Sequence, residues 1–459
     1  MKRLTSLFTL AVAALVLMQC EPNVSERTPD SGNANFSSYV AVGNSLTAGY
    51  ADNALHRDGQ LNAFPAILAE QMKQAGGGDF FQPLVNPGVG SNADGQARLE
   101  LRLVPGPDGQ PTLSPQPAAA DGQDIFRRQQ TGPFNNVGVP GARIFHLVTP
   151  GYGNSAAGAG NFNRFFTRFK SDPMATVVGD AMLAEPTFFS LWIGNNDVLG
   201  YATSGGSGNP DGGIGGMDIT PMDVFQQSLD GIIATLTAGG AKGVVLGIPD
   251  ITTIPFFTTV PWNGLVLTAE QAGMLRAGFA AQLAAMGVPD EQIPALVPDF
   301  QAGQNGFLIA DPETAVVNFR LATENDLILL SVPQDSLRTR WGSQVPIPNR
   351  FTLRQEQIQA INTATTQFNT ALETAASGAG LVYVDMNPTL QQARTGLVFD
   401  GMLLSTQFVT GGLFSLDGVH LSPRGNAVVA NGVIEAINRG YGATLSPVNI
   451  SAYEGVRFP

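Results

Sequence analysis

Short apolar segments alternate along this chain with longer segments of helical periodicity, and this alternation limits the fold more than any other feature. Four short apolar segments predict strands, at residues 38–43, 185–194, 242–250 and 380–386. Four longer segments predict amphipathic helices, at residues 63–72, 222–240, 352–376 and 422–439. Strands that alternate with helices pair in parallel through right-handed crossovers. The sequence therefore predicts an α/β fold around a central parallel sheet.

Two long segments interrupt this alternation. Residues 76–134 are dominated by Gly, Pro, Gln, Asn and Asp with weak periodicity, which predicts an irregular insertion. In residues 255–345, Leu275, Phe279 and Leu283 lie one helical turn apart, but the flanking stretches are broken by Pro and Gly, as is typical of an inserted subdomain. Long ordered insertions often form walls or lids. We therefore expect these two to shape a pocket.

The N-terminus has the composition of a targeting segment. Lys2 and Arg3 precede the apolar run "LFTLAVAALVLM", which is short for a membrane span but has the length of a signal-peptide core. The run ends at "LMQC", where Cys20 is the only cysteine of the chain. This stretch resembles a bacterial lipoprotein signal, with Leu17 three residues before the cysteine, although Gln19 stands where such signals have a small residue.

The resemblance implies that residues 1–19 are removed as a signal peptide and that Cys20 carries a lipid anchor. Residues 20–36 are then a lipidated, polar linker, followed by a domain at 37–445 and a C-terminal tail at 446–459. We expect a membrane-anchored lipoprotein of the cell envelope, in the outer membrane or facing the periplasm. With Cys20 lipidated, no thiol remains for a disulfide, which suits an oxidising compartment.

Composition argues against several classes of function. The 459 residues are 43% hydrophobic and only 13% charged, so the chain can bury a large core. Its formal net charge of −13, with no basic run after Arg3, disfavours nucleic acid as a partner, because phosphate binding needs clustered Lys and Arg. Three scattered histidines and one cysteine provide no zinc site, and the loops at 208–218 match a Ca²⁺ site only faintly. We expect no metal and no cofactor.

A serine follows the first predicted strand, in the turn "VGNSLTAG". Serine is a poor nucleophile until a base removes its proton, and histidine has the pKa suited to that task. His56 lies in a polar stretch, and the apolar surroundings of His146 in "ARIFHLV" are typical of a structural histidine. His420 lies directly ahead of the last predicted helix. It is therefore the strongest candidate for a base that serves Ser45.

An acid stands close to this histidine in the sequence. Asp417 precedes His420 by three residues, so both side chains can lie on one loop, where the carboxylate would orient the imidazole. The same residues also suit a turn followed by a helix cap from Ser422 or Asp417. Both interpretations stay open from this motif alone.

Acyl transfer to serine also needs donors aimed at the oxyanion that develops on the attacked carbonyl. "WIGNNDV", at 192–198, ends a predicted strand, so an Asn amide can project from the carboxyl edge of the sheet, where open parallel sheets bind ligands. "NNVGVPGAR", at 135–143, has glycines that let a backbone N–H approach a substrate. Each loop alone also fits ordinary turn chemistry.

In their order along the chain, these four motifs together resemble the SGNH hydrolase (GDSL esterase/lipase) family. The resemblance implies that Ser45 is the nucleophile, that His420 is the base and that Asp417 orients it. Asn44 stands where the family commonly has Asp. The Gly-x-Ser-x-Gly elbow of α/β-hydrolases is not found in the sequence.

The resemblance also implies three donors to the oxyanion. These are the backbone N–H of Ser45, the backbone N–H of Gly141 and the side-chain amide of Asn196. Gly138 fits the glycine position of the motif as well as Gly141 does. The choice between the two glycines stays open at this stage.

The family has a flavodoxin-like three-layer α/β/α sandwich with a central parallel sheet, which here would carry long insertions. The resemblance implies a serine esterase or lipase-like hydrolase that cleaves carboxylic esters through an acyl-enzyme. Its partner would be a small-molecule, lipid or glycan ester, and short acyl esters, acetylated sugars and phospholipids are all open. The alternative is an envelope lipoprotein that binds a glycan or acylated ligand without turnover.

Overall fold

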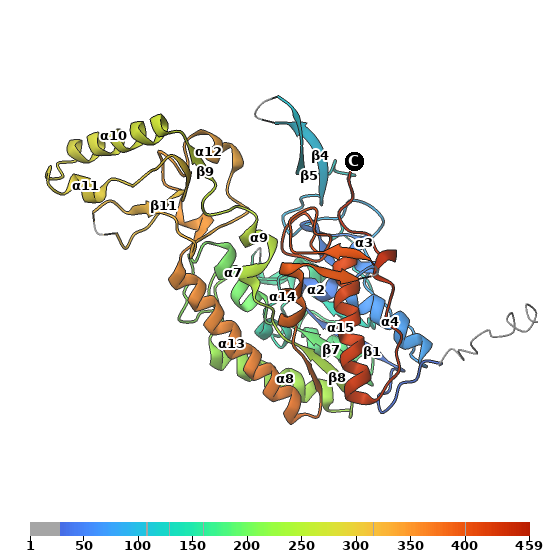
Figure 1. Ribbon diagram of the computed structural model, residues 1–459. Helices are drawn as coiled ribbons and strands as arrows, with labels where there is room; N and C mark the ends of the chain where they lie inside the picture. Colours follow the sequence, from blue (N-terminus) through green and yellow to red (C-terminus); the bar gives the residue numbers. More distant parts are fainter. Residues whose placement is uncertain (1–27, 107–108, 128, 159, 315, 400) are drawn as a thin grey trace, which may run out of the picture.

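The computed structural model describes residues 28–106, 109–127, 129–158, 160–314, 316–399 and 401–459 (Figure 1). Its centre is a five-stranded sheet of β1 (Tyr39–Gly43), β6 (Asn136–Gly138), β7 (Phe188–Trp192), β8 (Lys242–Leu246) and β15 (Val382–Val384). The order in space is β15-β8-β7-β1-β6, and every neighbouring pair is parallel. Counted along the chain, this order is 2-1-3-4-5, the flavodoxin-like arrangement. The predicted fold is confirmed.

Helices cover both faces of this sheet, as Figure 1 shows. One face carries α4 (Phe64–Gln74) and α15 (Pro423–Tyr441). The opposite face carries α6 (Val177–Met182), α8 (Met222–Thr237) and α13 (Gln355–Gly378). All residues of β1 and β7 are consequently buried, which explains why these strands are apolar on both faces apart from Ser190, whose hydroxyl is hydrogen-bonded to that of Tyr39 (2.7 Å).

The predicted helices form within a few residues of the expected bounds, because each buries its apolar face on the sheet or on a neighbouring helix. Phe225 of α8 stacks on Phe368 of α13 with ring centroids 4.0 Å apart. Ser422 caps α15 by accepting a hydrogen bond from the backbone N–H of Gly425 (3.1 Å). Over the described residues, we find no helix that combines the length and apolar character needed to cross a bilayer.

The first insertion contains regular structure that the sequence did not predict. A hairpin of β4 (Leu99–Pro105) and β5 (Pro111–Pro117) projects from the body of the molecule (Figure 1).

Short α-helices and strands also lie between the main elements, outside the second insertion. They are α2 (Ser45–Ala48), β2 (Tyr50–Ala51), β3 (Ala54–Leu55), α3 (Arg57–Leu61), α5 (Arg164–Thr167), α7 (Asn196–Thr203), α14 (Asn387–Thr395), β16 (Leu397–Phe399) and β17 (Met402–Leu404).

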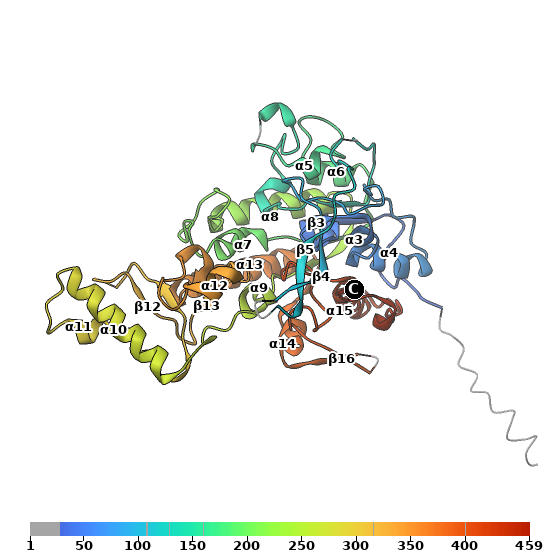
Figure 2. The ribbon, with the colours of Figure 1, turned by 90° about the horizontal axis from the view of Figure 1, so that it is seen from above.

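The second insertion extends from one side of the body, as Figure 2 shows. It contains α9 (Pro255–Thr258), β9 (Leu265–Leu267), α10 (Ala269–Ala285), α11 (Ile293–Leu296), β10 (Gly303–Asn305), β11 (Leu308–Ala310), β12 (Phe319–Leu321), β13 (Leu327–Ile328) and α12 (Gln334–Thr339), and β14 (Thr352–Leu353) pairs with β13 just beyond it. Two small apolar clusters lie here, separate from the main core. Arg320 joins Asp311 and Asp326 through ion pairs of 2.7 Å. This packing is that of a subdomain.

The packed part of the chain begins earlier and ends later than the sequence indicated. Residues 1–19 and Cys20 lie outside the described residues. Within the expected linker, Asp30 and Thr444 exchange two hydrogen bonds, and Phe36 is buried in the main core. In the expected tail, Ile450 is fully buried in the same core. The linker and tail interpretations are therefore wrong for these parts, because both pack on the domain.

Candidate active site

Ser45 lies at the carboxyl edge of the sheet, directly after β1. Asn44 follows the last residue of the strand and caps α2, since its Oδ1 accepts a hydrogen bond from the backbone N–H of Leu46 (3.0 Å). Ser45 is thus the first residue of a short helix, where backbone N–H groups have no acceptor within the helix. The direction of strand order reverses between β1 and β7, and ligands bind at such points in open α/β sheets.

The structure brings the serine, the histidine and the aspartate of the sequence motifs together. Nε2 of His420 lies 2.9 Å from Oγ of Ser45, although 375 positions separate the two residues. Nδ1 of His420 lies 2.9 Å from Oδ2 of Asp417. The other oxygen of Asp417 accepts hydrogen bonds from the backbone N–H groups of Val419 (2.9 Å) and His420 (2.8 Å). Asp417 thus orients the imidazole, while Ser422 is the cap of the next helix.

Asp417 is held in its charged form. Burial disfavours that charge, but it is outweighed by the charge and hydrogen bonds of His420 and by the backbone N–H of Asn53, so the pKa of Asp417 lies below its ordinary value. An ionised Asp417 can only accept a hydrogen bond, so the proton of the neutral imidazole lies on Nδ1 of His420. The lone pair of Nε2 then faces the hydroxyl of Ser45, as general-base catalysis requires.

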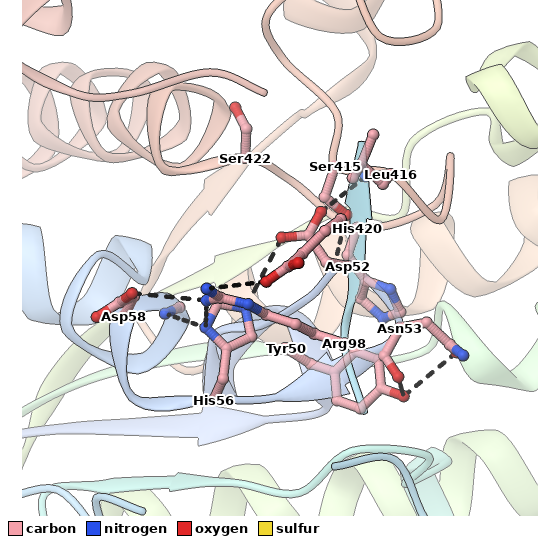
Figure 3. Close-up of polar contacts among 12 residues, drawn as sticks. Tyr50, Asp52, Asn53, His56, Asp58, Arg98, Ser415, Leu416, His420 and Ser422 are labelled. Carbon is pink, nitrogen blue, oxygen red and sulfur yellow. Dashed lines mark hydrogen bonds and ion pairs between the residues drawn. The ribbon is translucent and has the colours of Figure 1, made fainter. Parts of the chain in front are cut away.

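A second segment supports the acid-bearing loop, and sequence reasoning missed it (Figure 3). The carboxylate of Asp52 accepts from the backbone N–H of Leu416 (2.9 Å), and the backbone N–H of Asp52 donates to Oγ of Ser415 (3.0 Å). Asn53 donates its backbone N–H to Asp417 (2.9 Å). The ring of Tyr50 lies 4.8 Å from that of His420. The only sequence signal was the position of these residues shortly after Ser45.

The other two histidines have structural roles. His56 caps α3 through Nδ1, which accepts from the backbone N–H of Gly59 (3.1 Å), and its Nε2 lies 3.9 Å from Asp52. Nδ1 of His146 accepts from the backbone N–H of Arg143 (3.1 Å). Burial and nearby arginines lower the pKa of both histidines to about 4, so both are neutral at pH 7. Neither contacts Ser45.

Asn196 starts α7 beside the serine. Its Nδ2 donates one hydrogen bond to the carbonyl of Ala142 (2.8 Å), and the amide has a second N–H to offer. Asn196 lines the same cavity as Ser45 and His420. Asn195 also lines this cavity, but its Oδ1 accepts a hydrogen bond from the side chain of Asn44 (3.2 Å). Of the two asparagines, Asn196 is therefore the one whose amide is held against the loop after β6.

The two candidate glycines differ in what their backbone N–H groups do. Gly138 ends β6 and donates its N–H to Oδ1 of Asn136 (2.9 Å), so this donor is already used. Gly141 lies in a turn closed by a hydrogen bond from Ala142 to Val139 (3.0 Å), and its φ of +80° is one that glycine adopts readily. This arrangement favours Gly141 as the oxyanion donor.

Asp197 joins the two loops that carry the predicted oxyanion donors. It is fully buried, and its carboxylate accepts from the backbone N–H of Ile144 (3.0 Å). Burial raises the pKa of Asp197 to about 7, although this hydrogen bond acts to lower it. The contact fixes the loop after β6 against α7. The sequence placed Asp197 in the right motif without indicating this role.

The loop at 208–218 has a different use for its acidic side chain. Asp218 accepts hydrogen bonds from the backbone N–H groups of Asn209 (2.9 Å) and Gly215 (2.8 Å). Across the described ranges, no three His, Cys, Asp or Glu side chains converge in the way a metal ion requires. Asp218 therefore closes a turn.

The profile of the GDSL-like lipase/acylhydrolase family matches residues 39–433. The chain belongs to this family. One solved structure that it matches is an extracellular lipase from Streptomyces rimosus, with 12% identity, a TM-score of 0.31 and coverage of 87% of this chain and 98% of the lipase. Among curated proteins, no match was found.

Membership of the GDSL family makes this chain a hydrolase of the lipase and acylhydrolase type. In this GDSL hydrolase, Asn44 stands where the family commonly has Asp. The Asn side chain both caps α2 through its oxygen and donates through Nδ2 to Asn195. An aspartate could make the first of these bonds but not the second, because an ionised carboxylate has no donor.

Proposed function

We propose that the chain is a serine esterase that cleaves carboxylic esters through an acyl-enzyme. The observation that carries this proposal is the 2.9 Å contact between Nε2 of His420 and Oγ of Ser45, with Asp417 bonded to the far side of the imidazole. A serine so placed has a base within reach of its proton. Membership of a family of ester hydrolases supports the same reaction.

The reaction proceeds in two steps. Nε2 of His420 takes the proton of Ser45, and Oγ attacks the ester carbonyl to give a tetrahedral oxyanion. The bond to the alcohol oxygen then breaks, and His420 gives its proton to the departing alcohol, which leaves the acyl-enzyme. Water, deprotonated by His420, attacks the acyl carbonyl; the bond to Oγ of Ser45 then breaks as His420 returns its proton to Oγ, which releases the acid and restores the serine. Asp417 stays ionised and stabilises the imidazolium at each step.

The oxyanion receives hydrogen bonds from the backbone N–H groups of Ser45 and Gly141 and from the amide of Asn196. The hydrogen bond from Asn196 to Ala142 fixes the amide, so no reorientation is needed when the charge develops. Asp197 supports the same alignment through Ile144.

The test is the Ser45→Ala variant with p-nitrophenyl butyrate as substrate. We expect turnover to be lost while the circular dichroism spectrum and the melting temperature stay close to those of the parent. A fluorophosphonate probe should label the parent and not the variant. Absence of labelling in the parent would instead favour binding of a glycan or acylated ligand without turnover, and full activity of the variant would refute the assignment of Ser45.

We further propose that Cys20 carries a lipid that tethers the enzyme to a membrane of the cell envelope. The support is the sequence pattern ahead of Cys20. In a bacterial host, the full chain should incorporate labelled palmitate and sediment with membranes, whereas Cys20→Ser should do neither. Equal labelling of both forms would refute the anchor.

A further inference from the structure

An apolar cavity opens beside Ser45. Its volume is about 100 Å³, several times the space that one water molecule needs. Among the described residues that line it, the polar ones gather around Ser45, apart from Thr389. The apolar wall includes Leu46, Trp192, Ile254, Met386, Leu390 and Ala393. Trp192 directs its Nε1–H to the carbonyl of Gly247 (3.1 Å), so its polar group is already satisfied.

The place of this cavity in the fold is defined by the strands that it follows. Its lining comes from residues at or after the ends of β1, β7, β8 and β15, from α14 and α15, and from the loop that carries His420 ahead of α15. Gly141 lies in the loop after β6, at the opposite edge of the sheet. Asn196, the other predicted donor, lines the cavity itself, whereas Gly141 is not among the described lining residues. A carbonyl oxygen that points toward Gly141 therefore leaves the rest of the cavity to a chain attached to the carbonyl carbon.

We propose that this cavity holds the acyl chain, so that the substrates are esters of medium-length aliphatic acids rather than acetyl esters. The inference rests on the proposed function, since it assigns the substrate of that same site. An acetyl group would leave the cavity to water, which its apolar walls bind poorly.

The chemistry distinguishes the acyl side from the alcohol side. His420 protonates the departing alcohol and later activates water, so water must enter where the alcohol left. A cavity with apolar walls is a poor route for that water. The acyl chain, in contrast, stays bonded to Ser45 through both steps. It therefore gains from burial in the formation and in the hydrolysis of the acyl-enzyme.

Burial of each methylene group sets the expected size of the preference. A factor of about four in kcat/KM per added methylene follows from the free energy of transfer of this group out of water. We expect kcat/KM for p-nitrophenyl esters to rise from acetate through butyrate and hexanoate. It should fall once the chain is longer than the cavity.

The wall itself provides the decisive variants. Ala393 is buried on α14 and faces the cavity, whereas Gln391 is exposed on the same helix. Ala393→Leu should lower kcat/KM for the octanoate ester relative to the acetate ester by about tenfold or more, because the new side chain takes the place of the substrate chain. The matched control, Gln391→Leu, should leave the chain-length profile unchanged.

A second variant guards against a folding defect in the first. Leu390 is only half-buried, so Leu390→Ala should fold, and it should extend the preferred chain length. A flat profile, a preference for acetate, or unchanged profiles in both cavity variants would overturn the inference. So would a dependence on the length of the alcohol instead of the acid. If the parent protein showed neither esterase activity nor fluorophosphonate labelling, the proposed function would be overturned as well.

Discussion

The carboxylate of Asp417 accepts a hydrogen bond from the backbone N–H of Asn53 (2.9 Å), a residue 364 positions earlier in the chain. This bond joins the segment after the nucleophile to the loop that carries the base. Two further bonds of Asp52 reach the same loop at Ser415 and Leu416. The distance between Ser45 and His420 is therefore set by a short segment that lies close to both.

The first prediction concerns Asp417→Asn. We expect kcat for p-nitrophenyl butyrate to fall by about 10³–10⁴, because a carboxamide N–H that faces Nδ1 favours the tautomer whose Nε2 carries the proton. The same N–H would also face the backbone N–H of Asn53. Loss of that acceptor should cost about 1–3 kcal/mol in the free energy of unfolding, measured with urea.

A matched control for this variant is Asp58→Asn, since Asp58 is exposed and its carboxylate lies 3.5 Å from Arg98 rather than near Asp417. Its activity and unfolding midpoint should match those of the parent. If Asp417→Asn kept more than a tenth of the parent activity, the orienting role of Asp417 would be wrong.

The second prediction is a pH-dependent effect of Asp52→Asn. Burial raises the pKa of Asp52 from its ordinary value of 3.8 to about 6, so the carboxylate is charged above pH 6. Its charge there favours the imidazolium of His420. The ratio of parent to variant kcat/KM should be near one at pH 5 and should rise to about threefold by pH 8.

Stability should change in the same pH range with a defined sign. Since the folded state binds the proton of Asp52 more tightly than the unfolded state, the parent loses stability as the pH rises from about 4 to about 6. Asp52→Asn has no such loss. The free energy of unfolding of the variant should therefore rise relative to that of the parent by up to about 3 kcal/mol across this window. A difference that is independent of pH would contradict the raised pKa of Asp52.

The parts of the site that the sequence predicted share one property, which is a local pattern. Asp417 and His420 lie on one loop, so their spacing alone brings the acid to the base. Ser45 and Asn196 follow strands that are neighbours in the sheet, so their proximity follows from the topology. The support from Asp52 and Asn53 depends on the path of a loop between elements, which no periodicity encodes.

The fold shows the same division. The long helices and four of the five central strands have apolar patterns set by burial, whereas β6 has only three residues and was not predicted. The hairpin of β4 and β5 was missed because Pro111, Pro115 and Pro117 occupy one of its strands, a composition that two-stranded edges tolerate. Phe36 was assigned to a linker because its neighbours are polar, yet its own ring packs on Phe188 at 5.1 Å.

The third prediction addresses Asn196. Asn196→Ala should lower kcat by about 10²–10³ with a smaller change in KM, because the amide acts on the oxyanion rather than on the bound ester. Asn196→Asp keeps the size but places a negative charge beside the oxyanion, so its loss should be at least as large. An unchanged kcat in both variants, measured with p-nitrophenyl butyrate, would exclude Asn196 from the oxyanion site.

The last prediction compares the two glycines of one loop. A Cβ at Gly138 would lie 2.3 Å from the backbone nitrogen of Ala48, so Gly138→Ala must displace α2 and with it Ser45. At Gly141, the nearest atom to a new Cβ is Nδ2 of Asn163 at 3.9 Å, and the backbone N–H is kept. Gly141→Ala should therefore cost about 1–2 kcal/mol from its left-handed φ and retain measurable turnover, whereas Gly138→Ala should lose most of its kcat. Urea unfolding and p-nitrophenyl butyrate kinetics on both variants give the comparison, and the reverse order of activities would show that Gly138 does not pack against the helix of the nucleophile.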